Sequence, residues 1–237
     1  MGYEPEVDAV IALKDGRRIA YCEWGDRDGM PIILCHGAPG SRVFAPDSDT
    51  TAQAGVRLIT VDRPGYGRSD PKPGRQILDW PADVEQLAAA LGVDEFDVAG
   101  HSSGGPYALA CASRFPERVK RVALVSCIAP YSLPSSEQGD DDDELTRLAW
   151  KDLGQAAVQF ARSVAWLVET PERFLDLPRS EPDRQLLADP AIRSMFAGTV
   201  REAQAGSRCV RLGLRVGAST LGHSARRDPR PSVDLPG

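Results

Sequence analysis

The sequence predicts an α/β protein in which a mostly parallel sheet is flanked by helices. The chain opens with a hairpin pattern over residues 8–26. From residue 31 to residue 130, short continuous apolar runs alternate with stretches of helical spacing. Continuous apolar runs indicate strands buried on both faces, and their alternation with helices is typical of a parallel sheet. With 237 residues, the chain is long enough for one large domain around such a sheet.

The elements follow in order along the chain. The hairpin turn is predicted at Asp15-Gly16, the kind of dipeptide most typical of tight hairpins. The spacing predicts one helix over 77–91, with Gly92 as its stop, and a second helix over 104–114. Buried strands are expected in the apolar runs at 31–37, 56–61, 95–100 and 121–130. In such sheets, functional sites lie at the carboxyl ends of the strands.

The composition of the sequence changes after residue 130. Residues 131–144 are polar and acidic, and the aspartate run within them lacks the glycine turn and terminal glutamate of a calcium loop. We therefore expect a solvated loop and no metal site there. The rest of the stretch to residue 204 has helical spacing. The sequence thus predicts a core over 1–130 and a helical cap over 131–204.

Composition and charge exclude several function classes. The net charge is −6, which does not favour binding to nucleic acid or to anionic membranes. No apolar run approaches the ~18 residues of a membrane span, and no signal peptide is visible at the N-terminus. The five cysteines are scattered, without a CxxC pair, which favours reduced thiols and a cytoplasmic location.

The five residues Gly100-His101-Ser102-Ser103-Gly104 join the strand at 95–100 to a helix of small residues. The pattern G-x-S-x-G between a strand and a helix is typical of a nucleophilic serine on a sharp turn. Its glycines leave room where a Cβ atom would clash. The alternative is a glycine/serine loop that only turns the chain. We interpret Ser102 as the nucleophile.

A second motif, His36-Gly37-Ala38, directly follows the strand at 31–37. A turn of this kind directs the backbone N–H of Ala38 at the carbonyl oxygen of a substrate, with the N–H of Ser103 as its partner. Two such donors form an oxyanion hole. His36 is interpreted as a residue that orients the loop, not as a general base.

Three motifs, HGAPGS, DRPGYGRSD and GHSSGG, together resemble the α/β-hydrolase family, and the resemblance covers about residues 7–130. It implies a serine hydrolase for a small carboxylic ester or related acyl substrate, without a cofactor. It also implies Ser102 as nucleophile and Ala38 and Ser103 as the oxyanion hole. A serine at this position argues against dehalogenases and epoxide hydrolases, which use aspartate there.

The sequence departs from the family pattern after the cap. The family places an acid and then a histidine on later strands, and neither strand is evident here, so the last core strands are expected to be missing. Of the three histidines, only His223 is left as a candidate base. His36 is interpreted as orienting its loop, and His101, next to Ser102 in the turn, is not expected to fold back onto it. Glu137 is the first carboxylate after the sixth strand, and we do not assign it as the acid. A sheet edge left uncovered would favour self-association.

Residues 205–237 form an atypical tail with six arginines and no lysine, glutamate or aromatic residue. One interpretation is a disordered basic tail. The other is translation in a wrong reading frame, in which case the chain is truncated and its activity impaired. Three further hypotheses stay open: an intact enzyme that uses His223, a non-catalytic protein that binds a small molecule in the same pocket, and a non-functional gene product that does not fold stably.

Overall fold

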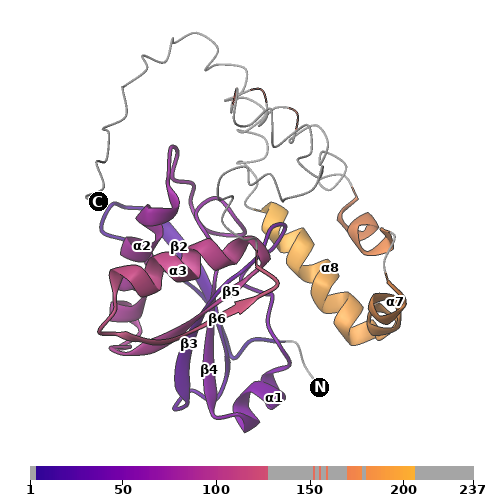
Figure 1. The fold of residues 1–237 in the computed structure, drawn as a ribbon, viewed down its shortest axis with the longest axis horizontal. Helices are drawn as coiled ribbons and strands as arrows, with labels where there is room; N and C mark the ends of the chain where they lie inside the picture. The colour runs from indigo at the N-terminus through magenta and orange to yellow at the C-terminus, as the bar shows by residue number, and fades with distance from the viewer. Residues whose placement is uncertain are drawn as a thin grey trace, which may run out of the picture.

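A computed structural model describes residues 4–127, 170–177 and 180–205, together with the single positions 152, 155 and 159. Its centre is a sheet of six strands in the order β1-β2-β4-β3-β5-β6 (Figure 1). The strands are β1 Val7–Ala12, β2 Arg18–Gly25, β3 Met30–Cys35, β4 Val56–Val61, β5 Phe96–His101 and β6 Val119–Val125. β1 and β2 are antiparallel to their neighbours, whereas β3, β4, β5 and β6 pair in parallel. The predicted α/β-hydrolase fold with a mostly parallel sheet is confirmed.

The described helices lie between and after these strands. The helix expected over 77–91 is a 3-10 turn followed by α2, and the second expected helix is α3. The six-residue α1 was not predicted, because it carries no apolar run of helical spacing. Their bounds are α1 Ser48–Gln53, η1 Ile77–Asp79, α2 Trp80–Ala90, η2 Ser102–Gly104, α3 Gly105–Arg114, η3 Pro171–Asp176, α7 Glu181–Leu187 and α8 Pro190–Ala205.

The turn residues are those that the sequence marks. Gly16, in the hairpin between β1 and β2, has a φ of 84°, a left-handed conformation that glycine adopts without strain. Gly92 ends α2 with a φ of 65°. The hairpin prediction at Asp15-Gly16 and the helix stop at Gly92 are therefore confirmed.

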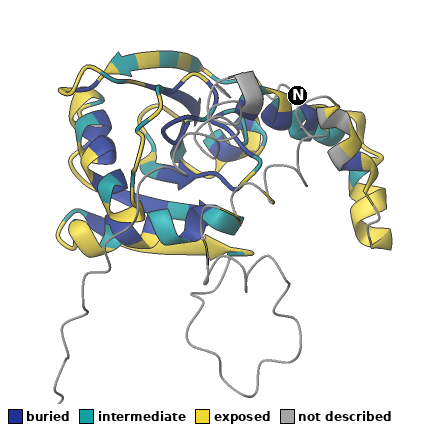
Figure 2. Cartoon of the chain, turned by 90° about the horizontal axis from the view of Figure 1, so that it is seen from above, coloured by how far each residue is buried: buried dark blue, intermediate teal, exposed yellow. Residues whose placement is uncertain are grey.

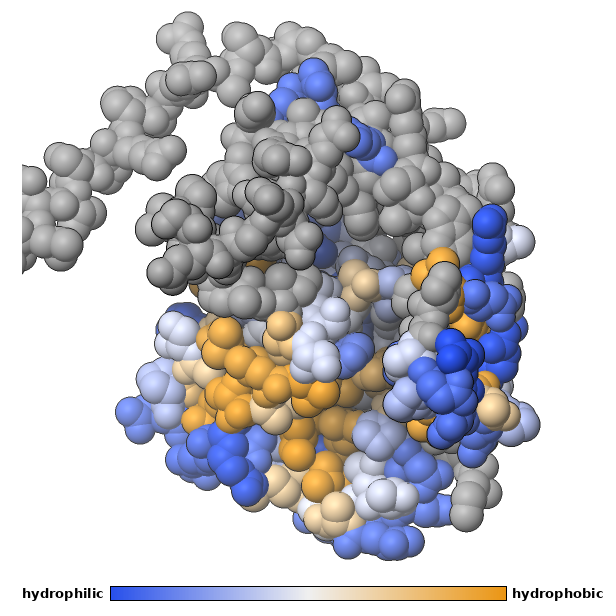
Figure 3. All heavy atoms as spheres, turned by 45° about the vertical axis from the view of Figure 1, so that its right-hand side comes forward, coloured by the Kyte–Doolittle hydropathy of each residue, from blue (hydrophilic) through white to orange (hydrophobic). Residues whose placement is uncertain are grey.

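Most strands of the sheet lie inside the molecule and are dark blue in Figure 2. The two clusters of buried side chains packed on the sheet differ in size. α2 and α3 cover one face and enclose the larger core. The opposite face holds a smaller cluster of buried side chains around Trp24. The larger core is centred on Ile33, Ile59, Val61, Trp80, Val84, Leu87, Phe96 and Val98. A contiguous apolar area also lies open on the surface seen in Figure 3.

β6 forms one end of the described sheet. Its first residue is buried, and the six that follow, 120–125, are exposed. Val122, Leu124 and Val125 have exposed fractions of 40%, 48% and 54%, which is unusual for apolar residues of a parallel strand. Among the described strands, β6 has β5 as its only neighbour. The described part of the chain therefore contains no strand beyond β6.

The helices η3, α7 and α8 fall within the segment predicted to be a helical cap, and they are helical as expected. α8 lies beside the sheet (Figure 1). Its Thr199 and Glu202 bond to Ser41 and Arg42, in the loop after β3. Most of 131–169 and the tail after 205 lie outside the described residues, so the domain boundaries at 130 and 204 stay predictions, as does the interpretation of the tail.

Candidate active site

Ser102 sits on a strained turn between β5 and α3. Its φ is 51°, a left-handed conformation that is uncommon for a residue with a side chain. The two glycines of the motif are required by close packing. A Cβ on Gly100 would lie 2.6 Å from the Cα of Gly105, and a Cβ on Gly104 would collide with the carbonyl oxygen of Cys35. The sequence therefore folds into the turn that the G-x-S-x-G pattern predicts.

The loop after β3 lies directly against this turn. β3 pairs with β5 so that Cys35 is opposite Gly100, which brings the residues after each strand together. A Cβ on Gly37 would lie 3.1 Å from the Cβ of Ser102 and 3.1 Å from Nδ1 of His101. The two motifs, more than 60 residues apart in the sequence, are thus in van der Waals contact.

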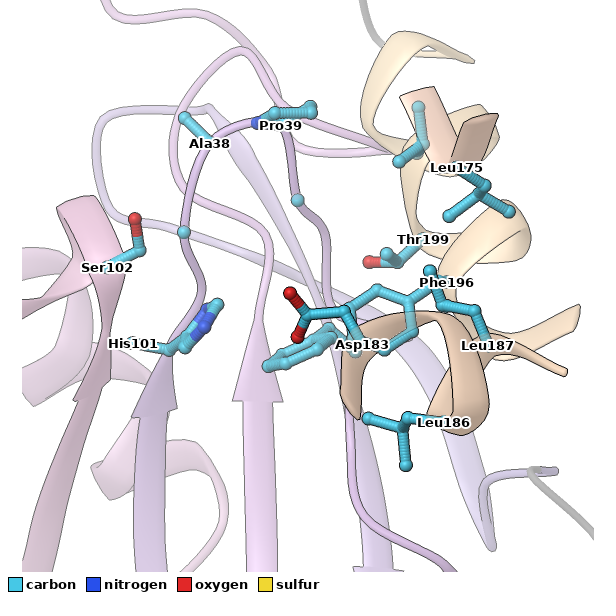
Figure 4. Close-up of a pocket in the computed structure, with 14 residues that line it drawn as sticks. Ala38, Pro39, His101, Ser102, Leu175, Asp183, Leu186, Leu187, Phe196 and Thr199 are labelled. Carbon is cyan, nitrogen blue, oxygen red and sulfur yellow. The ribbon is translucent and has the colours of Figure 1, made fainter. Parts of the chain in front are cut away.

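Ala38 and Ser102 open onto a cavity of about 260 Å³ (Figure 4). One wall comes from the two motifs and Phe44. The other comes from η3, α7 and α8, and most of its side chains are apolar. The lining residues are Gly37, Ala38, Pro39, Gly40, Phe44, His101, Ser102, Leu175, Asp183, Leu186, Leu187, Phe196, Thr199 and Val200. Such a cavity suits a small, largely apolar group placed next to Ser102.

Asp183 is the acidic side chain on this wall. Its carboxylate accepts a hydrogen bond from Oγ of Ser180 (2.7 Å), and its backbone N–H donates to the same Oγ. This reciprocal pair caps the start of α7. The described residues include no group of three or more histidine, cysteine, aspartate or glutamate side chains that could hold a metal ion.

His36 does not line the cavity. It is 1% exposed, its Nδ1 lies 2.7 Å from the carbonyl oxygen of Gly37, and its Nε2 accepts the backbone N–H of Arg63 at 3.2 Å. Burial, and secondarily the charge of Arg63, lower the pKa of His36 well below its ordinary value. A buried, neutral imidazole with both nitrogens occupied matches the expected loop-orienting role and leaves no nitrogen free for Ser102.

His101 has a different environment. Its ring stacks on Phe44 with 4.8 Å between centroids, it lines the cavity, and partial burial lowers its pKa. Within the described ranges, no side chain hydrogen-bonds to Oγ of Ser102. His223, the candidate base, and Glu137 lie outside the described residues. The geometry therefore brings together Ser102, the predicted nucleophile, and Ala38, in the loop predicted to form the oxyanion hole, and it does not place the base.

A buried ionic cluster fixes the loop after β3 to its surroundings. Arg42, 3% exposed, pairs with Asp62 (2.9 Å), Asp8 (2.8 Å) and Glu202 of α8 (2.5 Å). Asp62 is fully buried, and burial raises the pKa of its carboxyl to about 6 against the pull of Arg42. Because Asp62 also accepts the backbone N–H of Arg68, the cluster joins the loops after β3 and β4 to α8.

Ser41 gives a second link between the same loop and α8. Its backbone N–H donates to Oγ1 of Thr199 (3.2 Å), and its hydroxyl donates to the carbonyl oxygen of Thr199 (3.1 Å). Both residues are buried. Sequence reasoning missed Thr199, Phe44 and Phe196 as cavity residues. Nothing in their local sequence patterns shows that residues so far apart in the chain meet.

A mostly parallel sheet with a serine on a strand-to-helix turn defines the class of α/β hydrolases. The sequence model of the alpha/beta hydrolase fold matches residues 30–187. The chain therefore belongs to the α/β-hydrolase fold family. Within the described part of the chain, every helix is too short or too polar to span a membrane.

Several relatives with established names are similar to this chain. A non-heme chloroperoxidase of Streptomyces lividans is 37% identical over 136 residues, which cover 55% of this chain and 48% of the relative. A proline iminopeptidase of Xylella fastidiosa is 32% identical over 130 residues, covering 51% and 39%. A bifunctional esterase/perhydrolase of Acinetobacter calcoaceticus is 31% identical over 138 residues, covering 55% and 48%. The chain thus spans about half the length, or less, of these relatives.

Solved structures share the fold. An esterase from Rhodococcus superposes with a TM-score of 0.56 and 24% identity, covering 87% of this chain and 72% of that one. An alpha/beta hydrolase fold protein from Nakamurella multipartita gives 0.57 and 21%, covering 90% and 74%. At these identities the likeness is one of fold.

Proposed function

We propose that this chain is a serine hydrolase for a small carboxylic ester or a related acyl substrate, with Ser102 as nucleophile. The observation that carries the proposal is the strained turn at Ser102, in contact with the loop of Ala38 and open to a largely apolar cavity. One of the named relatives, a bifunctional esterase/perhydrolase, supports acyl chemistry. The small cavity supports a small acyl group over a long chain.

In the proposed reaction, Oγ of Ser102 attacks the acyl carbonyl carbon and its proton passes to a base. The carbonyl oxygen becomes an oxyanion held between the N–H groups of Ala38 and Ser103. α3 begins three residues after Ser102, so the positive end of its dipole also favours this charge. The alcohol leaves, and water then releases the acid from the acyl-serine. These steps use side chains and backbone N–H groups, so the proposal includes no cofactor.

We further propose that turnover is slow. His223 remains the candidate base and no acid is assigned, and no described side chain bonds to Oγ of Ser102. In serine hydrolases that lose triad members, the oxyanion hole and binding still leave ~10³–10⁴-fold acceleration over water. We therefore expect the turnover of an ester to be impaired while the hydroxyl of Ser102 remains reactive.

A fluorophosphonate probe followed by intact-protein mass spectrometry tests the proposal. Ser102 should form an Oγ–P bond with loss of fluoride, its hydroxyl proton passing to base or solvent. Ser102→Ala should remain unlabelled and Ser103→Ala should be labelled, because only the N–H of Ser103 is used. Ester hydrolysis that survives in His223→Ala would show that His223 is not the base.

The second candidate function is a non-catalytic protein that binds a small molecule in the same cavity. It is favoured by the absence, within the described ranges, of a base bonded to Ser102. It predicts that binding of a small apolar carboxylate, followed by calorimetry, is equal in the wild type and in Ser102→Ala. It also predicts no labelling by the fluorophosphonate, which separates the two functions.

We also propose self-association of two copies through β6. The exposed apolar residues of this strand support it, and so does its sequence. In an antiparallel pair centred on Ala123, Val122 lies opposite Leu124 of the second copy and Arg121 lies opposite Val125. Like charges therefore do not meet across the pair.

The compartment is proposed to be the cytoplasm. The four described cysteines, Cys22, Cys35, Cys111 and Cys127, are free thiols, and the first three are buried. Free buried thiols suit a reducing compartment. The test is localisation of the tagged full chain by fractionation.

A further inference from the structure

We propose that Arg63 is a positioning residue for the oxyanion hole, because it holds the Gly37–Ala38 peptide with the Ala38 N–H directed at the cavity. Its positive charge stands behind that peptide and favours the negative charge that develops on the other side. The inference rests on the proposed function, since it assigns a task to Arg63 only if Ala38 binds an oxyanion.

The first step of the argument is the orientation of one peptide unit. The carbonyl oxygen of Gly37 accepts a hydrogen bond from Nη2 of Arg63 at 3.0 Å. The Gly37–Ala38 bond is trans, since the cis bond of this loop is the next one, Ala38–Pro39. In a trans peptide the C=O and the N–H point in opposite directions. With the carbonyl held by Arg63, the N–H of Ala38 points away from Arg63, and Ala38 itself lines the cavity.

Arg63 also fixes the second donor to the same carbonyl. Its backbone N–H donates to Nε2 of His36 at 3.2 Å, so this nitrogen is unprotonated. The imidazole proton therefore lies on Nδ1, which donates to the carbonyl oxygen of Gly37 at 2.7 Å. The lowered pKa of His36 keeps the ring neutral, and the hydrogen bond from the backbone N–H of Arg63 selects this tautomer. Arg63 thus acts on the peptide twice, through its side chain and through its backbone.

The guanidinium of Arg63 is held firmly, and the described residues place no negative charge against it. Arg63 is 3% exposed, and its Cζ lies 4.8 Å from the ring centroid of Tyr66 and 4.5 Å from that of Tyr107. Within the described ranges it has no carboxylate partner, and its Nε has no hydrogen-bond partner. A buried cation to which the described residues give no counterion is costly, so its contacts with the carbonyl of Gly37 and the two tyrosine rings matter for holding it there.

The positive charge of Arg63 favours the negative charge that develops during acyl transfer. A cation that binds a carbonyl oxygen polarises the peptide and makes the N–H of that unit a stronger donor. At low dielectric, the same charge attracts an oxyanion that forms on the far side of the peptide. A residue that only filled space between two tyrosines would do neither.

The experiment compares the rate of fluorophosphonate labelling of Ser102 in the wild type, Arg63→Lys and Arg63→Met. Arg75→Met is the matched control, because Arg75 also stacks on Tyr107 and donates to its hydroxyl (2.7 Å). Loss of one oxyanion donor typically costs ~10²–10³ in rate. We expect Arg63→Met to label ~10–100-fold more slowly, Arg63→Lys to fall between it and the wild type, and Arg75→Met to stay near the wild-type rate.

Thermal melts select the variants that remain folded. Folded Arg63→Met that labels at the wild-type rate would overturn the inference, as would an equal loss in Arg75→Met. If wild-type Ser102 does not react at all, the proposed function fails. The positioning role of Arg63 is then tested by NMR alone, through the chemical shift of the Ala38 amide resonance. A shift of that resonance in Arg63→Lys and Arg63→Met, but not in Arg75→Met, supports it. An unchanged resonance overturns it.

Discussion

β5 and β6 are neighbouring parallel strands, yet their surroundings differ. Phe96 and Val98 of β5 are each 1% exposed, whereas Val122 and Leu124 of β6 are 40% and 48% exposed. β5 leads to Ser102 and is held between β3 and β6, while β6 ends the described sheet.

This difference in burial between β5 and β6 shows which contacts determine the geometry of the site. The turn at Ser102 and the loop of Ala38 depend on the contact of β5 with β3, inside the sheet, and on the buried cluster around Arg42. Neither depends on the outer side of β6. Changes in the loops after β3 and β4 should therefore affect stability and the reactivity of Ser102, whereas changes on β6 should affect assembly.

The largest effect is expected from Arg42→Met. This change leaves the fully buried carboxylate of Asp62 without its cation, and breaking a buried pair in this way typically costs ~3–5 kcal/mol. Urea denaturation should show that loss in the free energy of unfolding. Arg18→Met is the control, because the Arg18–Asp70 pair is exposed to solvent and its loss should change the free energy of unfolding far less. Equal losses in the two variants would mean that the cluster does not organise the loops.

A smaller effect on the free energy of unfolding is expected from protonation of His36. Its pKa is lowered in the folded state, so below pH 6.5 the unfolded chain binds a proton that the folded chain does not. Stability should therefore fall as pH drops below 6.5, by up to ~1.4 kcal/mol per pH unit from this group. In His36→Gln the slope of unfolding free energy against pH should be reduced by that amount between pH 6.5 and 5. The half-buried His101 serves as comparison, and His101→Gln should reduce the slope less. Parallel profiles for the wild type and His36→Gln would contradict the burial of a neutral imidazole.

Substitutions on β6 are expected to have the smallest effect on the free energy of unfolding and a clear effect on dimer formation. Leu124→Lys places a charge opposite Val122 of the second copy and should shift the chain from dimer to monomer in light scattering. Since Leu124 is half exposed, the free energy of unfolding should change by less than ~0.5 kcal/mol. Leu78→Lys, at a residue 77% exposed on η1, should leave the dimer intact. A wild-type chain that is monomeric at high micromolar concentration would rule out pairing through β6.

The sequence predicted the parts of the site that are local. The G-x-S-x-G turn and the His36-Gly37-Ala38 loop each follow one strand, and their residues are set by close packing at Gly100 and Gly104. The strands could also be predicted from local sequence, because a continuous apolar run indicates a strand that is buried on both faces.

The far wall of the cavity could not be predicted. Phe196 and Thr199 line the same cavity as Ser102, and α8 is held there by bonds to Ser41 and Arg42, more than 150 residues away in sequence. The contact of Arg63 with the loop after β3 could not be predicted from the sequence either. Its contact with the carbonyl of Gly37 depends on tyrosines from two separate segments.

The central claim is that the described core holds a competent nucleophile and oxyanion hole. The most direct test is stopped-flow reaction with p-nitrophenyl acetate, whose leaving group needs no protonation. The account predicts a burst of about one p-nitrophenolate per chain, followed by slow turnover, and no burst in Ser102→Ala. A wild-type trace without a burst, identical to that of Ser102→Ala, would contradict it.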